Sequence, residues 1–441
     1  MEPAQTSSRE VKGLKLILRS LRYRNFRLFF FGQSISLIGT WMQMVAMSWL
    51  VYNLTHSVFL LGVVGFASQI PAFLFAPLAG VLIDRWNRRR LVIATQTLSM
   101  IQAFILAALA LSGHVAAWHI ILLSIFIGLV NGFDIPGRQA FLVDMIDGKD
   151  DLGNAIALNS TMFNGARLVG PSIAGILISF VGEGVCFLLN GLTFLAVIVA
   201  LLAMKIAPKE KSGQRPYVMQ ELREGFSYAF GFAPIRSVLL LLALVSFMGM
   251  PYMVLMPIFA KTILHGGSRT LGFLVAASGA GAFLGSLYLA SQRSVLGLGK
   301  MIAIASGIFG IGLVAFSLSR VLILSLFPLL LTGFGIMVQM ASSNTLLQTI
   351  VEEDKRGRIM SFFTMAFVGM EPCGSLLAGS LASAIGAPNT LMIGGACCIL
   401  GSLAFASRLS ALSEMINPIY IKLGIIPDVA AGIQMAAEET G

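Results

Sequence analysis

Four charged side chains interrupt long apolar stretches of the sequence, where a charge is costly and therefore a candidate for function. Glu371 and Arg167 each stand twelve residues into a stretch, which is about 18 Å of helix and close to the middle of a membrane. Asp134 and Arg138 are four residues apart, so they can pair on one helix face. An ionised group at a helix centre costs about 2.5–3.5 kcal/mol on insertion scales. We therefore predict proton-coupling roles for Glu371 and Asp134.

Each of these charges also has a purely structural interpretation. Glu371 can form a hydrogen bond or ion pair to another helix beside Pro372. Arg138 can extend toward the membrane surface, because its apolar stretch ends a few residues later. Arg138 and Arg167 are thus predicted as intramembrane cations, with Asp134 as the candidate partner of Arg138.

The elements that carry these charges must cross a membrane. Hydrophobic residues make up 57% of the 441-residue chain and charged residues only 11%, against about 25% charged in soluble proteins. A spanning helix needs about 20 mainly apolar residues. Division of the apolar stretches at turns and charges predicts twelve helices and an all-α membrane protein: 28–52, 57–83, 91–112, 120–142, 155–181, 184–204, 237–260, 270–292, 301–319, 321–349, 359–386 and 388–407.

The basic residues predict the orientation of these helices. Of the thirty Lys and Arg, only Lys261, Arg269 and Arg320 fall on the outer side if the N-terminus is cytoplasmic, as the positive-inside rule requires. The net charge of +10 follows from this bias, so no nucleic-acid partner is needed. The predicted parts are a cytoplasmic segment (1–27), a six-helix bundle (28–204), a cytoplasmic linker (205–236) with an amphipathic helix near 219–230, a second bundle (237–408) and a cytoplasmic tail (409–441). We expect a multi-pass protein of the cell (inner) membrane in contact with membrane lipid.

The two bundles are related by an internal repeat. Residues 150–177 align with residues 354–381 at an offset of 204, and every glycine in either window matches one in the other. The matched glycines are Gly153 with Gly357, Gly165 with Gly369, Gly170 with Gly374 and Gly175 with Gly379. Six spans per unit give both halves the same orientation, so we predict two parallel six-helix repeats with a site between them.

The loop after the second predicted helix holds a glycine, an acidic residue and a basic cluster. By themselves they fit a positively charged cytoplasmic loop. The stretch also resembles the helix 2–3 signature of the major facilitator superfamily, with Asn87 where a second glycine is usual. The resemblance implies a gating role for five residues: Gly80, Asp84, Arg85, Arg88 and Arg89.

The fifth predicted helix carries closely spaced glycines around a proline. Small residues allow tight helix packing, and the pattern resembles the antiporter motif of the same superfamily, which is associated with exporters. The motif residues are Gly165, Gly170, Pro171 and Gly175. Gly165 stands one position early and Ala174 replaces a usual glycine. As a whole the chain resembles the enterobactin-exporter-like, drug/proton antiporter branch.

In the resembled fold, helices 1, 4, 7 and 10 line a central cavity. Polar residues on these helices can bind a substrate or merely bond to a neighbouring helix, and the 31 Phe and 22 Met predict a mostly apolar cavity. The candidates are Gln33, Ser36, Thr40, Gln43, Asn131, Tyr252, Gln339, Ser343 and Asn344.

The resemblance implies a secondary active exporter of an amphipathic small molecule, siderophore or drug-like, that exchanges protons by alternating access. A lysophospholipid or lipid translocator of the same fold is the alternative. A membrane-embedded enzyme is disfavoured, because the sequence has neither HExxH nor a phosphate-binding glycine loop. We expect no cofactor and no metal, and the four cysteines show no zinc-ligand spacing.

Overall fold

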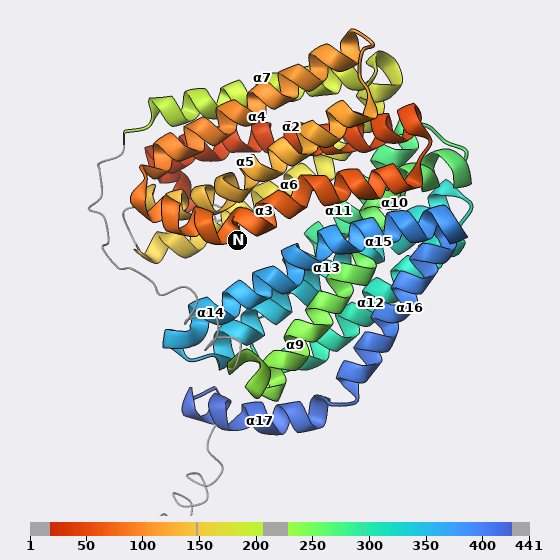
Figure 1. Ribbon diagram of the computed structural model, residues 1–441. Helices are drawn as coiled ribbons and strands as arrows, with labels where there is room; N and C mark the ends of the chain where they lie inside the picture. Colours follow the sequence, from red (N-terminus) through yellow and green to blue (C-terminus); the bar gives the residue numbers. More distant parts are fainter. Residues whose placement is uncertain (1–17, 147–148, 206–227, 293, 426–441) are drawn as a thin grey trace, which may run out of the picture.

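The structure is a computed structural model that describes residues 18–146, 149–205, 228–292 and 294–425 (Figure 1). Within those residues twelve helices are long and apolar enough to span a membrane. A short 3-10 turn, η1 (Arg19–Arg22), precedes the first of them. The first six spans are α2 (Arg24–Thr55), α3 (Val58–Arg85), α4 (Arg88–Leu111), α5 (Ala117–Asp144), α6 (Lys149–Val181) and α7 (Glu183–Ala203).

The second six spans include two that are interrupted by wide π turns. The seventh span consists of α9 (Ala233–Leu244), η2 (Val245–Gly249), α10 (Tyr252–Ile258) and η3 (Phe259–Ile263). The eleventh consists of α14 (Glu353–Thr364), η4 (Met365–Gly369) and α15 (Met370–Ile385). The others are α11 (Ser268–Ser291), α12 (Leu298–Leu318), α13 (Leu322–Ile350) and α16 (Ala387–Ala406). All twelve predicted helices are confirmed, although α6 begins at Lys149 rather than near residue 155.

The structure adds one element to the sequence prediction, and it describes only part of another. The predicted tail contains a further helix, α17 (Leu409–Lys422), whose length is too short to cross a membrane. Of the amphipathic helix predicted near 219–230, only the last residues are described, and they are helical. The remainder lies outside the described residues.

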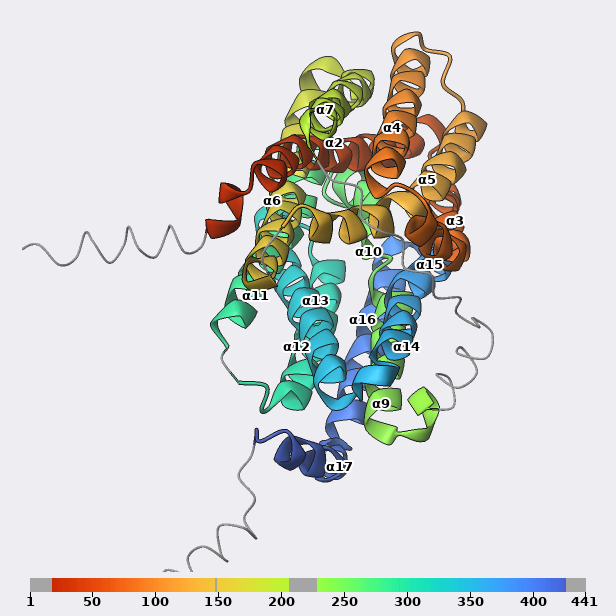
Figure 2. The same ribbon diagram turned by 90° about the vertical axis from the view of Figure 1, so that its left-hand side faces the viewer.

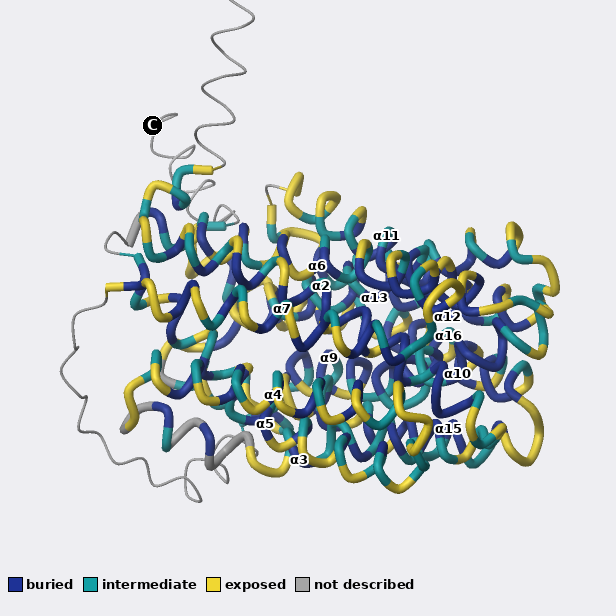
Figure 3. Tube along the Cα trace, turned by 90° about the horizontal axis from the view of Figure 1, so that it is seen from above, coloured by how far each residue is buried: buried dark blue, intermediate teal, exposed yellow. Residues whose placement is uncertain are grey.

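The helices form two bundles that meet at one end and separate at the other (Figures 1 and 2). The bundles touch mainly through α6 against α11 and α3 against α15. We call the meeting end, which carries the turns at 56–57 and 264–267, the closed end. Buried residues run through the middle of the bundles and exposed residues follow the outer faces (Figure 3).

Glycine pairs make the contacts between the bundles. A Cβ added to Gly175 would lie 2.9 Å from the Cα of Gly272, and one added to Gly62 would lie 3.0 Å from the Cα of Gly379. Because Gly175 and Gly379 are matched in the repeat, the two contacts are equivalent. The next matched glycines behave alike, since Gly170 packs on α2 and Gly374 packs on the seventh span. The repeat seen in the sequence therefore determines how the halves meet.

Candidate functional site

Glu371 and Arg167, which belong to opposite halves, interact electrostatically where the bundles meet. Glu371 lies in the first turn of α15, directly after the π turn η4. The side chain of Gln69 on α3 forms a hydrogen bond with its carboxyl group, and Arg167 on α6 attracts it electrostatically. Both partners belong to the N-terminal half. The hydrogen bond and the electrostatic attraction at Glu371 therefore depend on the relative position of the two halves.

The guanidinium of Arg167 has only some of its possible interactions satisfied at this position. Its guanidinium lies 5.6 Å from the ring centroid of Trp41, a cation–π contact. Its Nε atom is buried and has no hydrogen-bond partner among the described residues. A Cβ on Gly279 of α11 would lie 2.8 Å from the carbonyl oxygen of Arg167, so its backbone also lies on the boundary between halves. The cation thus keeps hydrogen-bonding capacity at the boundary.

Asp134 is, by contrast, fully engaged within the N-terminal half. Its side chain accepts hydrogen bonds from Thr95 (2.7 Å), Gln96 (2.9 Å) and Arg138 Nε (2.7 Å), and the residue is 3% exposed. The predicted pairing of Asp134 with Arg138 is confirmed by this geometry. The network joins α4 to α5 inside one bundle, and proton coupling by Asp134 remains a prediction.

Two predicted cavity residues are already satisfied inside the bundles. Gln43 donates to Gln102 at 2.9 Å and accepts from Asn190 at 2.7 Å. The hydroxyl of Tyr252 shares a 2.5 Å hydrogen bond with Ser278, and the residue is 1% exposed. Gln43 thus links α2, α4 and α7, and Tyr252 links α10 to α11. Their roles as substrate ligands remain predictions, and in this conformation their polar groups bond within the bundles.

The other cavity candidates divide by burial. Gln33, Ser36, Gln339 and Ser343 are at most 2% exposed. Each has at least one polar side-chain atom without a hydrogen-bond partner among the described residues, and for Gln339 both amide atoms lack one. The other three candidates are more accessible. Thr40 is exposed and donates to the carbonyl of Ser36 on its own helix. Asn131 and Asn344 are half-buried, and Asn344 accepts a hydrogen bond from Gln348.

The arginines of the loop after α3 bind within the N-terminal half. Arg88 lies 3.2 Å from Asp144 at the end of α5. Arg89 donates to the carbonyls of Leu201 and Leu202, both at 2.8 Å. Its positive charge at the C-terminus of α7 also interacts favourably with the helix dipole. The side chains of the other predicted gating residues lie outside the described set: Gly80, Asp84 and Arg85.

Asn87, which stands where the resembled signature has a glycine, is the N-cap of α4. Its side-chain oxygen accepts from the backbone N–H of Arg90 at 3.1 Å. Asparagine is among the favoured N-cap residues. The departure from the signature is therefore compatible with the same turn.

The antiporter-like motif lies along the contact faces of α6. Gly170 approaches Trp41 and the carbonyl of Ile38, and the carbonyl of Pro171 would lie 2.7 Å from a Cβ on Gly272. Gly175 packs against α11, whereas a Cβ on Gly165 would meet nothing within 4 Å. Three of the four motif residues thus form close helix contacts. The displaced glycine does not.

A lysine that the sequence analysis placed on the outer side, without a role in the site, bridges the halves at the closed end. Lys261 Nζ donates to Asn53 Oδ1 at 2.5 Å and lies 5.8 Å from the ring centroids of both Trp49 and Tyr52. Its neighbour Thr262 shares a 2.7 Å hydrogen bond with the hydroxyl of Tyr52. The signal in the sequence was the spacing of Trp49, Tyr52 and Asn53 on one helix face. Lys261 and these three residues form what we call the closed-end clamp.

A second contact supports the clamp nearby. Arg269 Nε donates to Ser179 at 2.7 Å and its guanidinium stacks 4.6 Å from the ring centroid of Phe180. Ser268 donates to the carbonyl of Gly175 at 3.1 Å. Both cations of the 260–270 segment therefore hold the N-terminal half.

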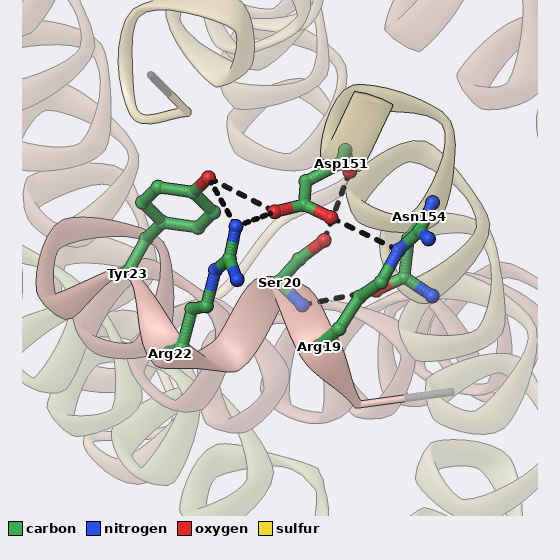
Figure 4. A network of polar contacts seen from close by, with 6 residues as sticks. All are labelled: Arg19, Ser20, Arg22, Tyr23, Asp151 and Asn154. Carbon is green, nitrogen blue, oxygen red and sulfur yellow. Dashed lines mark hydrogen bonds and ion pairs between the residues drawn. The ribbon is translucent and has the colours of Figure 1, made fainter. Parts of the chain in front are cut away.

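At the opposite end a buried aspartate holds the segment before α2. Arg19, Arg22 and Tyr23 surround Asp151 at the start of α6 (Figure 4), at 3.0, 2.5 and 2.9 Å. In the other half Lys355, 204 residues after Asp151, lies 4.5 Å from the ring centroid of Tyr228. A tyrosine thus contacts the start of the fifth span in each half. Its partner there is an aspartate in the N-terminal half and a lysine in the C-terminal half.

The comparisons with known proteins agree with this architecture. A family model described as transmembrane secretion effector matches residues 17–418. The chain belongs to the transmembrane secretion effector family. Among curated relatives, a staphyloferrin A transporter of Staphylococcus aureus is 26% identical over 86% of this chain and 94% of its own length. A multidrug efflux pump, Tap, of Mycolicibacterium fortuitum is 25% identical over 80% and 88%.

Solved structures show the same fold at low sequence identity. A bacterial homologue of the human lysosomal transporter Spinster, in an inward-facing and unoccupied conformation, matches with a TM-score of 0.65 and 15% identity, over 91% of this chain and 98% of that one. A POT family transporter in complex with a thioalcohol-conjugated peptide matches with a TM-score of 0.69 and 12% identity, over 88% and 96%. This member of the transmembrane secretion effector family is therefore a multi-pass transporter of the major facilitator superfamily and not an enzyme.

Proposed function

We propose that this protein is a secondary active exporter of an amphipathic small molecule, siderophore or drug-like, that exchanges its substrate for protons by alternating access. The observation that carries the proposal is the position of Glu371 between the halves, with Gln69 and Arg167 as partners from the other half. Relatives that transport a siderophore or pump drugs support the substrate class.

Glu371 supplies the proton-binding group in this proposal. An ionised carboxylate inside a membrane is stabilised by a hydrogen-bond donor and a nearby cation. When the halves rock about the glycine pairs, Gln69 and Arg167 move relative to Glu371, so its proton binding differs between conformations. A ligand or proton shifts a conformational equilibrium only through such a difference.

The energy available from one proton suffices for efflux. A unit charge that crosses 100 mV yields about 2.3 kcal/mol, or roughly fifty-fold accumulation. One exchanged proton per cycle therefore supports a useful substrate gradient.

The orientation in the proposal places both termini and the separated end in the cytoplasm. Lys261, Arg269 and Arg320 are at the closed end, whereas the basic residues near η1, Arg88 and Arg89 are at the separated end. The positive-inside rule assigns the basic end to the cytoplasm. In this orientation the conformation described is open inward.

The test is transport in proteoliposomes without ATP. The probe is a macrolide, because a macrolide efflux protein of Streptococcus pyogenes is a further relative, 20% identical over 85% of this chain. Purified Glu371→Gln protein, in which the side chain imitates the protonated acid, should bind the macrolide but lose the accumulation driven by an imposed pH gradient, keeping only downhill exchange. Glu353→Gln is the matched control, because this carboxylate on the same span is 91% exposed. It should transport at the wild-type rate.

Three results would change the proposal. Intact pH-driven accumulation by Glu371→Gln refutes the role of Glu371. If Asp134→Asn then loses this accumulation while Glu371→Gln keeps it, the proton-coupling role moves to Asp134. Translocation of a fluorescent lysophospholipid in place of the macrolide supports the lipid translocator instead.

A further inference from the structure

A pocket of about 480 Å³ lies between α17 and the ends of several spanning helices. Its apolar lining includes Val238 of α9, Leu346 of α13 and Phe405 of α16, together with Leu412 and Ile416 of α17. Polar groups lie on the same lining, from Lys300 of α12 and from Ser410, Ser413 and Asn417 of α17. This volume lies within the range of about 300–1,000 Å³ typical of small-molecule sites.

The depth of the pocket follows from the helices that line it. Pro234 is the second residue of α9, Lys300 the third of α12 and Phe405 the last but one of α16. Spanning helices end at the headgroup layer of a bilayer. The pocket is therefore at the level of the lipid headgroups, with Val238 one helical turn deeper than Pro234.

The helix that covers the pocket lies against the bundle as an amphipathic surface helix. Leu412, Ile416 and Tyr420, spaced four residues apart, are 6–8% exposed, and the hydroxyl of Tyr420 donates to the carbonyl of Val295 at 3.4 Å. Glu414 and Lys422 on α17 are exposed. Such helices lie in the membrane interface. α17 thus forms a pocket wall at the membrane surface.

The polar side of the pocket favours a negative charge. Lys300 is exposed and stands in the first turn of α12, whose N-cap, Gly297, provides no side-chain cap. The first backbone N–H groups of α12 add positive partial charge at this point. Arg408, directly before the lining residue Leu409, is a second exposed cation.

We propose that this pocket binds one anionic phospholipid, with an acyl chain along its apolar lining and the phosphate at Lys300. The order of apolar and cationic groups from the membrane interior outward matches the order of acyl chain and phosphate in a lipid. A bound lipid in this place would attach α17 to the C-terminal half. The proposal does not depend on the exporter mechanism, because the pocket lies within the C-terminal half and includes none of the residues between the halves.

The test measures lipid retention by native mass spectrometry of the whole protein, purified with equal amounts of phosphatidylglycerol and phosphatidylcholine. Wild type should retain phosphatidylglycerol preferentially. Lys300→Glu should reduce its retention about tenfold and abolish the preference over phosphatidylcholine. Ser413→Trp, at an exposed lining position, should reduce both lipids by obstruction.

Arg320→Glu is the matched control, since it makes the same change of charge at the closed end, and it should behave as wild type. Equal phosphatidylglycerol retention in Lys300→Glu and wild type, with unchanged thermal unfolding, overturns the proposal. Displacement of the retained lipid by inorganic phosphate also overturns it, because the site would then recognise the anion without the acyl chain.

Discussion

The closed-end clamp makes a quantitative prediction about the conformational equilibrium of the protein. Replacement of Lys261 by Met keeps the length of the side chain but removes its charge. The change deletes the 2.5 Å hydrogen bond to Asn53 and the cation–π contacts with Trp49 and Tyr52. Because all three partners belong to the other half, every lost contact stabilised the closed end.

The contact energies set the expected size of the shift. Each cation–π contact contributes about 0.5–1 kcal/mol at a partly exposed site, and a hydrogen bond to a charged group about 1.5–3 kcal/mol. Lys261 is half-buried and regains hydration when the clamp opens, so we take a net loss of about 2 kcal/mol, which is roughly a thirty-fold change in the equilibrium. Conformations open at this end should become correspondingly more populated.

Double electron–electron resonance measures this population directly. Spin labels at Leu111 and Leu318, exposed residues at the closed-end termini of α4 and α12, report the separation of the two halves. Lys261→Met should add a longer distance to the distribution. Lys205→Met, an exposed lysine at the other end of the bundle, should not. A distribution in Lys261→Met identical to that of wild type would refute the reasoning.

Three further predictions follow from contacts at other places. Gly175→Leu should slow transport and widen the closed end, because a Cβ there already lies 2.9 Å from Gly272, whereas Gly153→Ala, with nothing within 4 Å, should behave as wild type in the same transport and spin-label measurements. Asp151→Asn should lower the thermal unfolding midpoint by several degrees, since it leaves two arginines without their carboxylate; an unchanged midpoint would show that the network adds no stability. Burial raises the pKa of Tyr420, so its contribution to docking of α17 is complete below the ordinary value of about 10 and is lost as the pH rises through the raised pKa. A fluorophore on α17 should report this undocking in wild type, and the same pH response in Tyr420→Phe would contradict it.

The fold was predictable because membrane spans carry their signal locally. Charge-free stretches of about 20 residues have few alternatives to a helix in a bilayer, and the boundaries were wrong mainly where polar residues begin a helix, as at Lys149. α17 was missed because its 14 residues lack both the length and the continuous hydrophobicity of a span. The wide turns η2, η3 and η4 were not predicted, although each lies within three residues of a proline: Pro251, Pro257 and Pro372.

The candidate site was predictable only in part, for a physical reason. Intramembrane charges identify themselves by their cost, so Glu371, Arg167, Asp134 and Arg138 stood out from the sequence. The spacing also predicted the pairing of Asp134 with Arg138. The partners of Glu371 did not stand out, since Gln69 lies far away along the chain and is one polar residue among many. Gln43 shows a second limit of the sequence, because a polar stripe on one helix face fits an internal network such as the one with Gln102 and Asn190 as well as a cavity.

The equivalent glycine contacts also bear on how such a chain could arise. Each half has one glycine on its second span and one on its fifth. The second-span glycine of one half packs on the fifth-span glycine of the other, so Gly62 meets Gly379 and Gly272 meets Gly175. Two identical six-helix units with these glycines would possess a self-complementary surface, the condition for a symmetric homodimer. A gene for one half would then have encoded a complete assembly before duplication and fusion, and the asymmetric pair of Arg167 and Glu371 would have become accessible only afterwards, when the two copies could diverge.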